Sequence, residues 1–177
     1  MESKAQRRKK IVELSKKFPF DEKERQTDEV LNILKASPLW VSAQKIGLYM
    51  PTAIEFDLTK LFTENQEKEL LIPKCLPQRQ MIFAKYDPNQ LVRSDFGLLE
   101  PASNLAVEPD LILVPGLIWN EQGYRIGFGG GYYDRYLSNF TGKTASVLYD
   151  FQKANFQPEA HDIPVQQLFI GEKNNEY

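Results

Sequence analysis

The sequence has 177 residues, 42% of them hydrophobic, with a formal net charge of −2, one cysteine and one histidine. This length suits one domain with a substantial core, and the near-neutral charge predicts no general affinity for nucleic acid or anionic membranes. A lone cysteine excludes an internal disulfide framework, and one histidine leaves little material for a zinc site or a Ser-His-Asp triad. No apolar run reaches membrane-spanning length and no signal-peptide core is visible, so we expect a cytoplasmic protein.

The segment 2–17 is predicted to be a basic helix. Lys4 and Arg8 are four residues apart, so they share one face of that helix. Such a face is most often simply solvated. An Arg fork and a Lys ammonium one turn apart can also grip a polyphosphate, which is the sharper hypothesis. An arm that binds nucleic acid is the weakest alternative, because no aromatic residues are interleaved with the basic ones.

Helical and strand-like patterns alternate along the rest of the chain. The predicted helices cover 21–35, about 57–62, and a segment starting at 132; the predicted strands cover 45–50, 70–72, 81–86, 111–114, 145–149 and 168–170. The section 87–110 is expected to be irregular, and a loop of that length is usually functional or mobile. The alternation predicts an α/β fold: a single domain over 1–177 with three α/β/α layers, a mostly parallel central sheet, and a frayed tail at 172–177.

The loop after the strand at 45–50 is a candidate pocket wall. In open α/β sheets, ligands bind just outside the carboxyl ends of the strands. Tyr49, Met50 and Glu55 lie there in the sequence. Met and Tyr are more often core residues than ligand contacts, so at this point the core interpretation is favoured for those two.

The most informative stretch is VPGLIWNEQGYRIGFGGGYYDRYL at 114–137. An apolar strand at 111–114 is followed by a polar loop, then by the glycine run 127–131 and the start of a helix at Tyr132. Consecutive glycines are costly in backbone entropy, so a protein keeps them where backbone needs positive φ or a close approach. Bare N–H groups before a helix favour an anion, which predicts a phosphate cradle. The plain alternative is a wide turn packed against an aromatic pair.

Neither standard phosphate motif fits this stretch. A dinucleotide fingerprint would need its third glycine where Tyr132 stands, and a Walker A loop ending at 142–144 would need glycine in place of Leu137. The stretch differs from a plain turn because it also contains Arg125, two tyrosines and Asp134. Together they can supply phosphate donors, a stacking surface and a magnesium ligand.

At this stretch the chain resembles the 5-formyltetrahydrofolate cyclo-ligase family, also called methenyltetrahydrofolate synthetase, whose signature is similar to VPGxxFDxxGxRLGxGxGYYDR. Further blocks agree in order along nearly the whole chain: Lys4 with Arg8, the Y-M-P-x-x-x-E segment ending at Glu55, Pro73-Lys74, Glu100-Pro101 and His161-Asp162. The resemblance implies an enzyme that uses ATP to cyclise 5-formyltetrahydrofolate to 5,10-methenyltetrahydrofolate, releasing ADP and phosphate. It implies phosphoryl activation of the N5-formyl oxygen.

The resemblance also implies residue roles. ATP would be bound by Lys4, Arg8, Arg125, Gly127, Gly129, Gly130, Gly131, Tyr132, Tyr133 and Asp134. The folate would contact Met50, Glu55, Phe128 and Tyr132, and Mg²⁺ would be held by Asp134 and Asp162. Arg125 and Tyr132 would act as catalytic residues, and Phe83 and Phe96 would flank the pocket. Apart from the resemblance, Asp134 suits a helix cap or an ion pair and Asp162 suits a turn.

Departures from the family pattern concern charge. Phe128 stands where many relatives have a basic residue, and Gly130 where some have Lys, so positive charge beside the phosphates or the folate tail is reduced. A relative that binds folate or nucleotide without turnover is therefore an alternative, as is a sugar-phosphate isomerase or acyltransferase on a similar scaffold. The expected partners are small molecules only, with no nucleic acid and no membrane, and the expected state is a monomer.

Overall fold

The structure, a computed structural model, describes residues 2–64 and 67–174. Within them, the centre of the fold is a six-stranded sheet in the order β10-β9-β6-β1-β2-β3. Its strands are β1 (Lys45–Gly47), β2 (Glu69–Leu76), β3 (Gln80–Lys85), β6 (Leu111–Leu113), β9 (Lys143–Leu148) and β10 (Gln167–Ile170). Neighbouring strands run parallel except β2 and β3, which form an antiparallel pair at one edge. The predicted mostly parallel sheet is confirmed.

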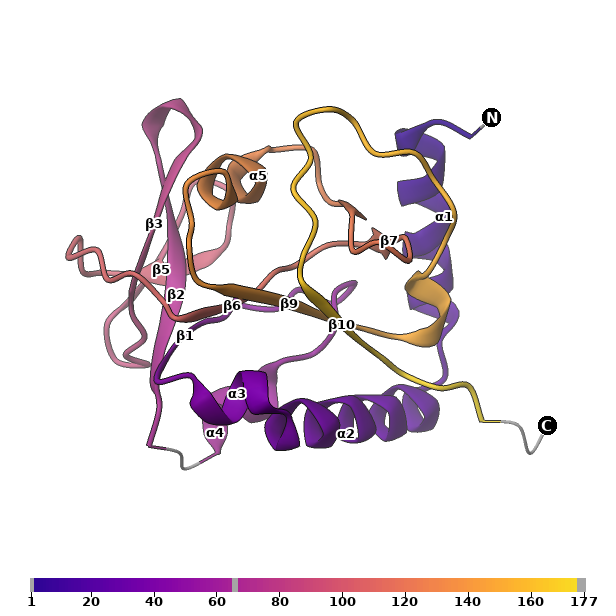
Figure 1. Ribbon diagram of the computed structural model, residues 1–177, viewed down its shortest axis with the longest axis horizontal. Coiled ribbons are helices and arrows are strands. Elements are labelled where there is room, and N and C mark those ends of the chain that lie inside the picture. The colour runs from indigo at the N-terminus through magenta and orange to yellow at the C-terminus, as the bar shows by residue number, and fades with distance from the viewer. Residues whose placement is uncertain (1, 65–66, 175–177) are drawn as a thin grey trace.

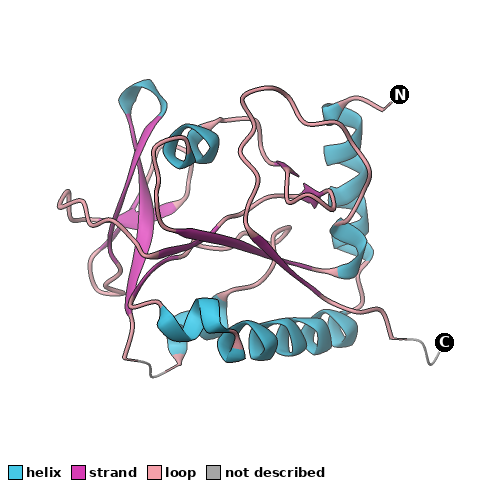
Figure 2. Cartoon of the chain, in the orientation of Figure 1, coloured by secondary structure: helices cyan, strands magenta, loops and turns pink. Residues whose placement is uncertain are grey.

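Helices lie on both sides of this sheet. They are α1 (Lys4–Lys17), α2 (Phe20–Ala36), α3 (Pro38–Ser42), α4 (Thr59–Thr63) and α5 (Tyr132–Leu137), with short 3₁₀ turns η1 (Pro77–Arg79) and η2 (Asp150–Gln152). Helices α2, α3 and α4 cover one face, while α5 lies over the other, as Figure 1 shows. The face that carries α5 is otherwise covered mostly by loops (Figure 2). The three-layer prediction is therefore confirmed.

The core is divided by the sheet because successive residues of a strand point to opposite faces. On β6, Leu111 and Leu113 join the cluster beneath α2, whereas Ile112 joins the cluster beneath α5; all three are fully buried. Burial on both faces is typical of a central parallel strand. A third, smaller cluster joins Ile11 of α1 to Ile118 and Ile126.

Two hairpins were not predicted. Strands β4 (Leu91–Arg93) and β5 (Leu99–Pro101) pair within the section 87–110 that was expected to be irregular, and β7 (Ile118–Trp119) pairs with β8 (Arg125–Ile126) in the expected polar loop. Strands of two or three residues are too short to show a period in the sequence. Their turns rest on local hydrogen bonds instead, such as Gly97 N to Ser94 O at 2.9 Å.

Several element bounds also differ from prediction. The strand expected at 45–50 ends at Gly47, the helix expected at 57–62 is α4, and α3 was not predicted at all. Helix α3 begins where the Ser37 hydroxyl accepts a hydrogen bond from Trp40 N. At the other end of the chain, the carbonyl of Glu172 accepts a hydrogen bond from Arg25. The predicted fraying of 172–177 is not tested further, because 175–177 lie outside the described residues.

In the part of the chain that the structure describes, no helix has the length and hydropathy needed to cross a membrane.

Candidate functional site

The glycine run forms a tight turn between β8 and α5. Gly129 has φ +92° and Gly131, the residue that precedes the first turn of α5, has φ +75°. Residues other than glycine rarely adopt this left-handed backbone conformation, which explains why glycine is needed at these two positions. The expected need for positive φ is confirmed. The phosphate cradle itself stays a prediction.

Helix α1 reaches this turn from a distant part of the sequence. Arg8 Nε donates a hydrogen bond to the carbonyl of Gly127 at 2.6 Å, and Arg8 Nη2 lies 3.4 Å from the position that a Cβ on Gly129 would occupy. The helix starts with a capping box between Ser3 and Gln6 and is anchored by Ile11, which is 4% exposed. Capping and burial therefore hold the Arg8 guanidinium against the glycine turn, and its predicted role in binding phosphate stays a prediction.

Lys4 lies one turn earlier on α1 and forms an ion pair with Glu159. Both side chains are partly exposed, so this pair contributes little to stability and competes only weakly with another anion. The Glu159 carboxylate is also 3.5 Å from His161 Nε2. Lys4 is thus brought to the loop that carries Asp162, another predicted site residue.

Arg125, two residues before the glycine run, has a side chain only 7% exposed. Its Nε donates to Pro115 O at 3.0 Å, and its Nη1 lies 3.3 Å from both Ile163 O and Asp134 Oδ1. Burial lowers the pKa of this guanidinium, and the Asp134 carboxylate opposes that shift. Arg125 therefore links Pro115, Ile163 and the first turn of α5.

Asp134 and Asp162 come close to each other around Ile163. Asp134 Oδ1 accepts from Ile163 N at 3.2 Å, and Asp162 Oδ2 accepts from Glu159 N at 2.8 Å. Among the described residues, no cluster of three or more His, Cys, Asp and Glu is placed to hold a metal ion. Mg²⁺ is commonly bound by one or two carboxylates together with phosphate oxygens and water. The two aspartates fit that kind of shared site and not an all-protein cage.

Glu55 and Tyr133 contribute two buried polar groups, and Tyr133 also packs under the Arg125 guanidinium. Glu55 is 6% exposed; its Oε1 accepts from Thr52 N at 3.0 Å and Thr52 Oγ1 at 2.9 Å. Burial raises the pKa of the Glu55 carboxyl. The Tyr133 hydroxyl is buried with no hydrogen-bond partner among the described residues, and burial followed by the Glu55 charge raises its pKa. An orphaned buried hydroxyl is costly, so this spot suits a ligand that supplies the missing partner.

The aromatic residues that were predicted to line the site differ in how deeply they are buried. Phe83 is 1% exposed and packs edge-on against Tyr133, with ring centroids 6.4 Å apart. Tyr132 is partly buried, and its ring leaves no room for a side chain on Gly130. Phe128 and Phe96 are 58% and 72% exposed, so neither lies in a closed pocket. Met50, three residues after the end of β1, is partly buried.

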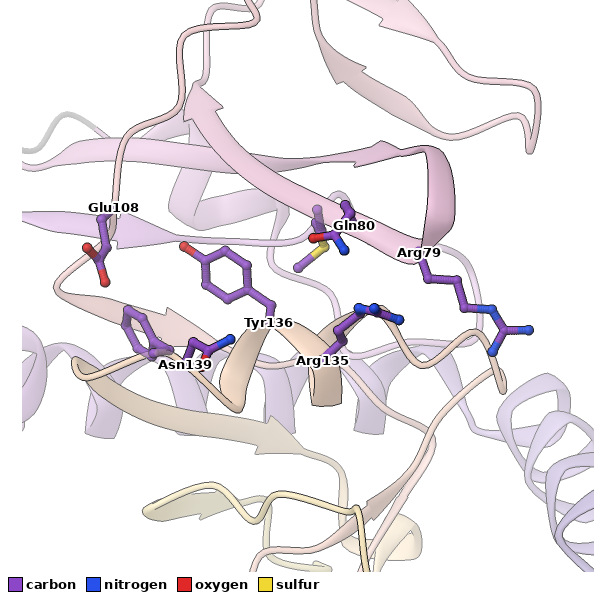
Figure 3. Close-up of a pocket in the computed structure, with 8 residues that line it drawn as sticks. Arg79, Gln80, Glu108, Arg135, Tyr136 and Asn139 are labelled. Atoms are coloured by element: carbon purple, nitrogen blue, oxygen red, sulfur yellow. The ribbon is translucent and has the colours of Figure 1, made fainter.

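Sequence reasoning missed a cavity of about 380 Å³ that lies between β3 and α5 (Figure 3). None of the predicted site residues lines it. Its connection to the glycine turn is Arg79, whose Nη1 lies 3.8 Å from the position of a Cβ on Gly131. Nothing in the sequence around Arg79 indicates that it would reach α5.

The sequence model of the 5-formyltetrahydrofolate cyclo-ligase family matches residues 1–170. The chain belongs to this family. Among solved structures, it is similar to a 5,10-methenyltetrahydrofolate synthetase from Aquifex aeolicus, with 36% identity, a TM-score of 0.83, and coverage of 94% of this chain and 89% of the other. A synthetase from Mycoplasma pneumoniae is 25% identical with a TM-score of 0.74, covering 95% and 98% of the two chains.

Among curated sequences, the 5-formyltetrahydrofolate cyclo-ligase of Haemophilus influenzae is 28% identical over 160 residues, which cover 82% of this chain and 83% of the relative. The predicted membership of the cyclo-ligase enzyme family is confirmed by these comparisons. The predicted residue roles are not tested by them.

Proposed function

We propose that this cyclo-ligase family member uses ATP to convert 5-formyltetrahydrofolate to 5,10-methenyltetrahydrofolate, with release of ADP and phosphate. Family membership supports the reaction. The observation that carries the proposal for the site is the left-handed glycine turn with Arg8 bonded to it and with Arg125 buried against Asp134 in the first turn of the following helix. The turn adjoins the interior where Tyr133 and Glu55 present unsatisfied polar atoms.

The nucleotide side supplies positioning and charge. Backbone N–H groups of 127–131, together with Arg8 and Lys4, would hold the phosphates, and Tyr132, Tyr133 and Asp134 would border the nucleotide. Phosphoryl transfer depends mainly on alignment and on neutralising charge, so this set needs no catalytic histidine or cysteine. Lys4 would exchange its exposed partner Glu159 for a phosphate oxygen.

On the folate side, Glu55 has one carboxylate oxygen that makes no hydrogen bond with a described residue, because both bonds from Thr52 reach Oε1. That oxygen would accept hydrogen bonds from the pterin ring. The Tyr133 hydroxyl would gain a partner from the same ligand. Met50, Phe128 and Tyr132 would contact the rest of the folate.

In the reaction, the N5-formyl oxygen attacks the γ-phosphorus of ATP and ADP leaves. N10 then attacks the activated formyl carbon and releases its proton, the ring closes, and phosphate departs with the former formyl oxygen. Arg125 and Tyr132 would lie nearest to these events, Arg125 by stabilising charge and Tyr132 by separating nucleotide from folate. Asp134 and Asp162 would hold Mg²⁺, which when bound neutralises charge on the phosphate oxygens. A cytoplasmic monomer that acts only on small molecules stays a prediction.

The direct test follows the near-ultraviolet absorbance of the methenyl product with purified protein, 5-formyltetrahydrofolate, ATP and magnesium. We expect an increase that vanishes without ATP. Arg8→Gln should raise the KM for ATP about tenfold or more, because a charge-assisted hydrogen bond to phosphate contributes about 1.5–3 kcal/mol. Arg7→Gln, one position away on the same helix, is the matched control and should behave like the wild type.

Either of two results would overturn this proposal. An absence of product despite bound folate and ATP would indicate a relative that binds without turnover, and would direct attention to Phe128. An Arg8→Gln variant with unchanged ATP kinetics would remove α1 from the nucleotide site.

A further inference from the structure

The cavity between β3 and α5 has a charged lining, with positive groups toward one end and a negative group at the other. Figure 3 shows the guanidinium groups of Arg79 and Arg135 toward one end and the carboxylate of Glu108 at the other. Gln80 and Asn139 add amide groups. The remaining wall is formed by Met81, Tyr136 and Phe140. A volume of about 380 Å³ is within the range of pockets that bind small molecules.

The charges of this lining are not neutralised by the protein itself. Within 2–64 and 67–174, the side chains of Arg79, Arg135 and Glu108 form neither an ion pair nor a hydrogen bond. Burial first, and then the nearby Glu108 charge, raises the pKa of Tyr136 to about 12, so the Tyr136 hydroxyl stays protonated. Arg79, Arg135 and Glu108 are all solvent-exposed, so water solvates their charges, and an anion placed between the two guanidinium groups would be attracted to both.

The backbone that carries Arg79 is held in an uncommon conformation. Gln78 and Arg79 have φ +62° and φ +58° in the turn between β2 and β3, which Gln80 N closes by donating to Pro77 O. Hairpin turns of this kind usually contain Asn or Gly, because other side chains are strained there. Strain of this kind is concentrated at functional positions. Here it directs Arg79 toward the start of α5, next to Gly131.

We propose that this cavity binds a small dicarboxylate that also carries an ammonium group, such as an acidic amino acid. Each guanidinium would take one carboxylate in a forked pair, and Glu108 would take the ammonium group. Two arginines and one glutamate give the lining a net charge of +1, which a ligand of net charge −1 balances. The methylene chain of the ligand would lie against Met81, Tyr136 and Phe140.

This cavity adjoins the proposed ATP site, because Arg79 Nη1 lies 3.8 Å from the position of a Cβ on Gly131, but it has a different lining. Helix α5 presents Tyr133 to Phe83 and Arg125, whereas Tyr136 and Arg135 line the cavity. None of the residues assigned to ATP, folate or magnesium lines it. The inference therefore does not depend on the proposed reaction, and the two can fail separately.

The test is isothermal titration of the full chain with three probes. These are L-glutamate, glutarate, which has the same two carboxylates without the ammonium group, and inorganic phosphate. We expect L-glutamate to bind at least tenfold more tightly than either of the others. Arg79→Gln and Arg135→Gln should each weaken glutamate binding at least tenfold, and Glu108→Gln should remove the preference for glutamate over glutarate. Lys85→Gln removes one positive charge at the far end of β3 and should leave binding unchanged.

Other outcomes would overturn the inference. Glutarate or phosphate binding as tightly as glutamate in the wild type would contradict the role of Glu108, and no glutamate binding at millimolar concentration would contradict the site. Wild-type affinity in both arginine variants, with circular dichroism spectra that match the wild type, would do the same. Affinity for 5-formyltetrahydrofolate should not change in Arg79→Gln; a parallel loss would assign the cavity to the folate site instead.

Discussion

Arg125 is buried in the site because polar groups surround its guanidinium. Arg125 was predicted from its place in the glycine stretch, but the sequence did not reveal that its guanidinium is almost fully buried against two carbonyls and Asp134. A charged group beside glycines suits an exposed phosphate contact as well as a buried anchor. Only tertiary packing distinguishes the two.

Asp134→Asn should lower the free energy of unfolding by about 1–3 kcal/mol, because the buried Arg125 guanidinium loses the one carboxylate that forms an ion pair with it among the described residues, while Asn keeps the size of the side chain. Urea denaturation would measure the change. Asp95→Asn, in the exposed turn between β4 and β5, is the control and should stay within about 0.5 kcal/mol of the wild type. Equal stabilities for the two variants would show that the Arg125–Asp134 pair contributes nothing to the fold.

Glu55 makes stability depend on pH. Burial raises the pKa of its carboxyl in the folded state above the unfolded value, so the folded protein binds more protons than the unfolded chain between the two values. The protonated Glu55 carboxyl contributes its full stability below the pKa that Glu55 has in the unfolded chain. That contribution is lost as pH rises through the pKa that Glu55 has in the folded protein.

Glu55→Gln should therefore be more stable than the wild type at neutral pH, with a difference that shrinks as pH falls below the glutamate range. The same variant should bind folate about tenfold or more weakly if Glu55 accepts hydrogen bonds from the pterin. Urea denaturation across pH and a folate titration would measure the two effects. A stability difference that does not change with pH would contradict the raised pKa.

Among the elements, those with clear periodicity were predicted and the short ones were not. The glycine turn was visible because three adjacent glycines have few structural explanations. The hairpins β4–β5 and β7–β8 consist of strands too short to alternate, and the turn at Gln78–Arg79 contains none of the residues that normally mark it. Arg79 was missed for that reason, because its direction is set by backbone strain that no sequence motif records.

Gln78→Asn should raise the free energy of unfolding by about 0.5–1 kcal/mol, since a left-handed conformation costs an ordinary residue about 1–2 kcal/mol and Asn tolerates it better. Thermal and urea denaturation would both report the gain. Gln157→Asn, in an exposed segment of loop, should leave stability unchanged. A loss of stability in Gln78→Asn would mean that the turn is not strained at that position.

For the whole molecule, the alternation of helices and strands was sufficient to predict the layers and the mostly parallel sheet. It was not sufficient to predict where α1 lies. That helix contacts neither face of the central sheet through a large surface; it is held by Ile11 in the small cluster with Ile118 and Ile126. Only the resemblance to a known family connected Arg8 with the glycine turn before the structure was available.

Ile11→Ala should destabilise the protein by about 2–4 kcal/mol, the usual cost of removing a buried aliphatic side chain, and should expose amides of α1 to hydrogen exchange. Leu14→Ala, at a position 43% exposed on the same helix, is the control and should change little. Protection of α1 that is unchanged in Ile11→Ala would show that other contacts hold the helix in place.

The bond between Arg8 and Gly127 joins residues 119 apart in the sequence, and Lys4 pairs with a residue still further along. On the ribosome, α1 emerges well before Gly127 and Glu159, so it cannot dock until those partners have been synthesised. During that interval Arg8 and Lys4 lack these two partners. Resistance of α1 to a protease would therefore appear only after residue 159 has emerged, which makes a helix that is synthesised early the last part of the site to be completed.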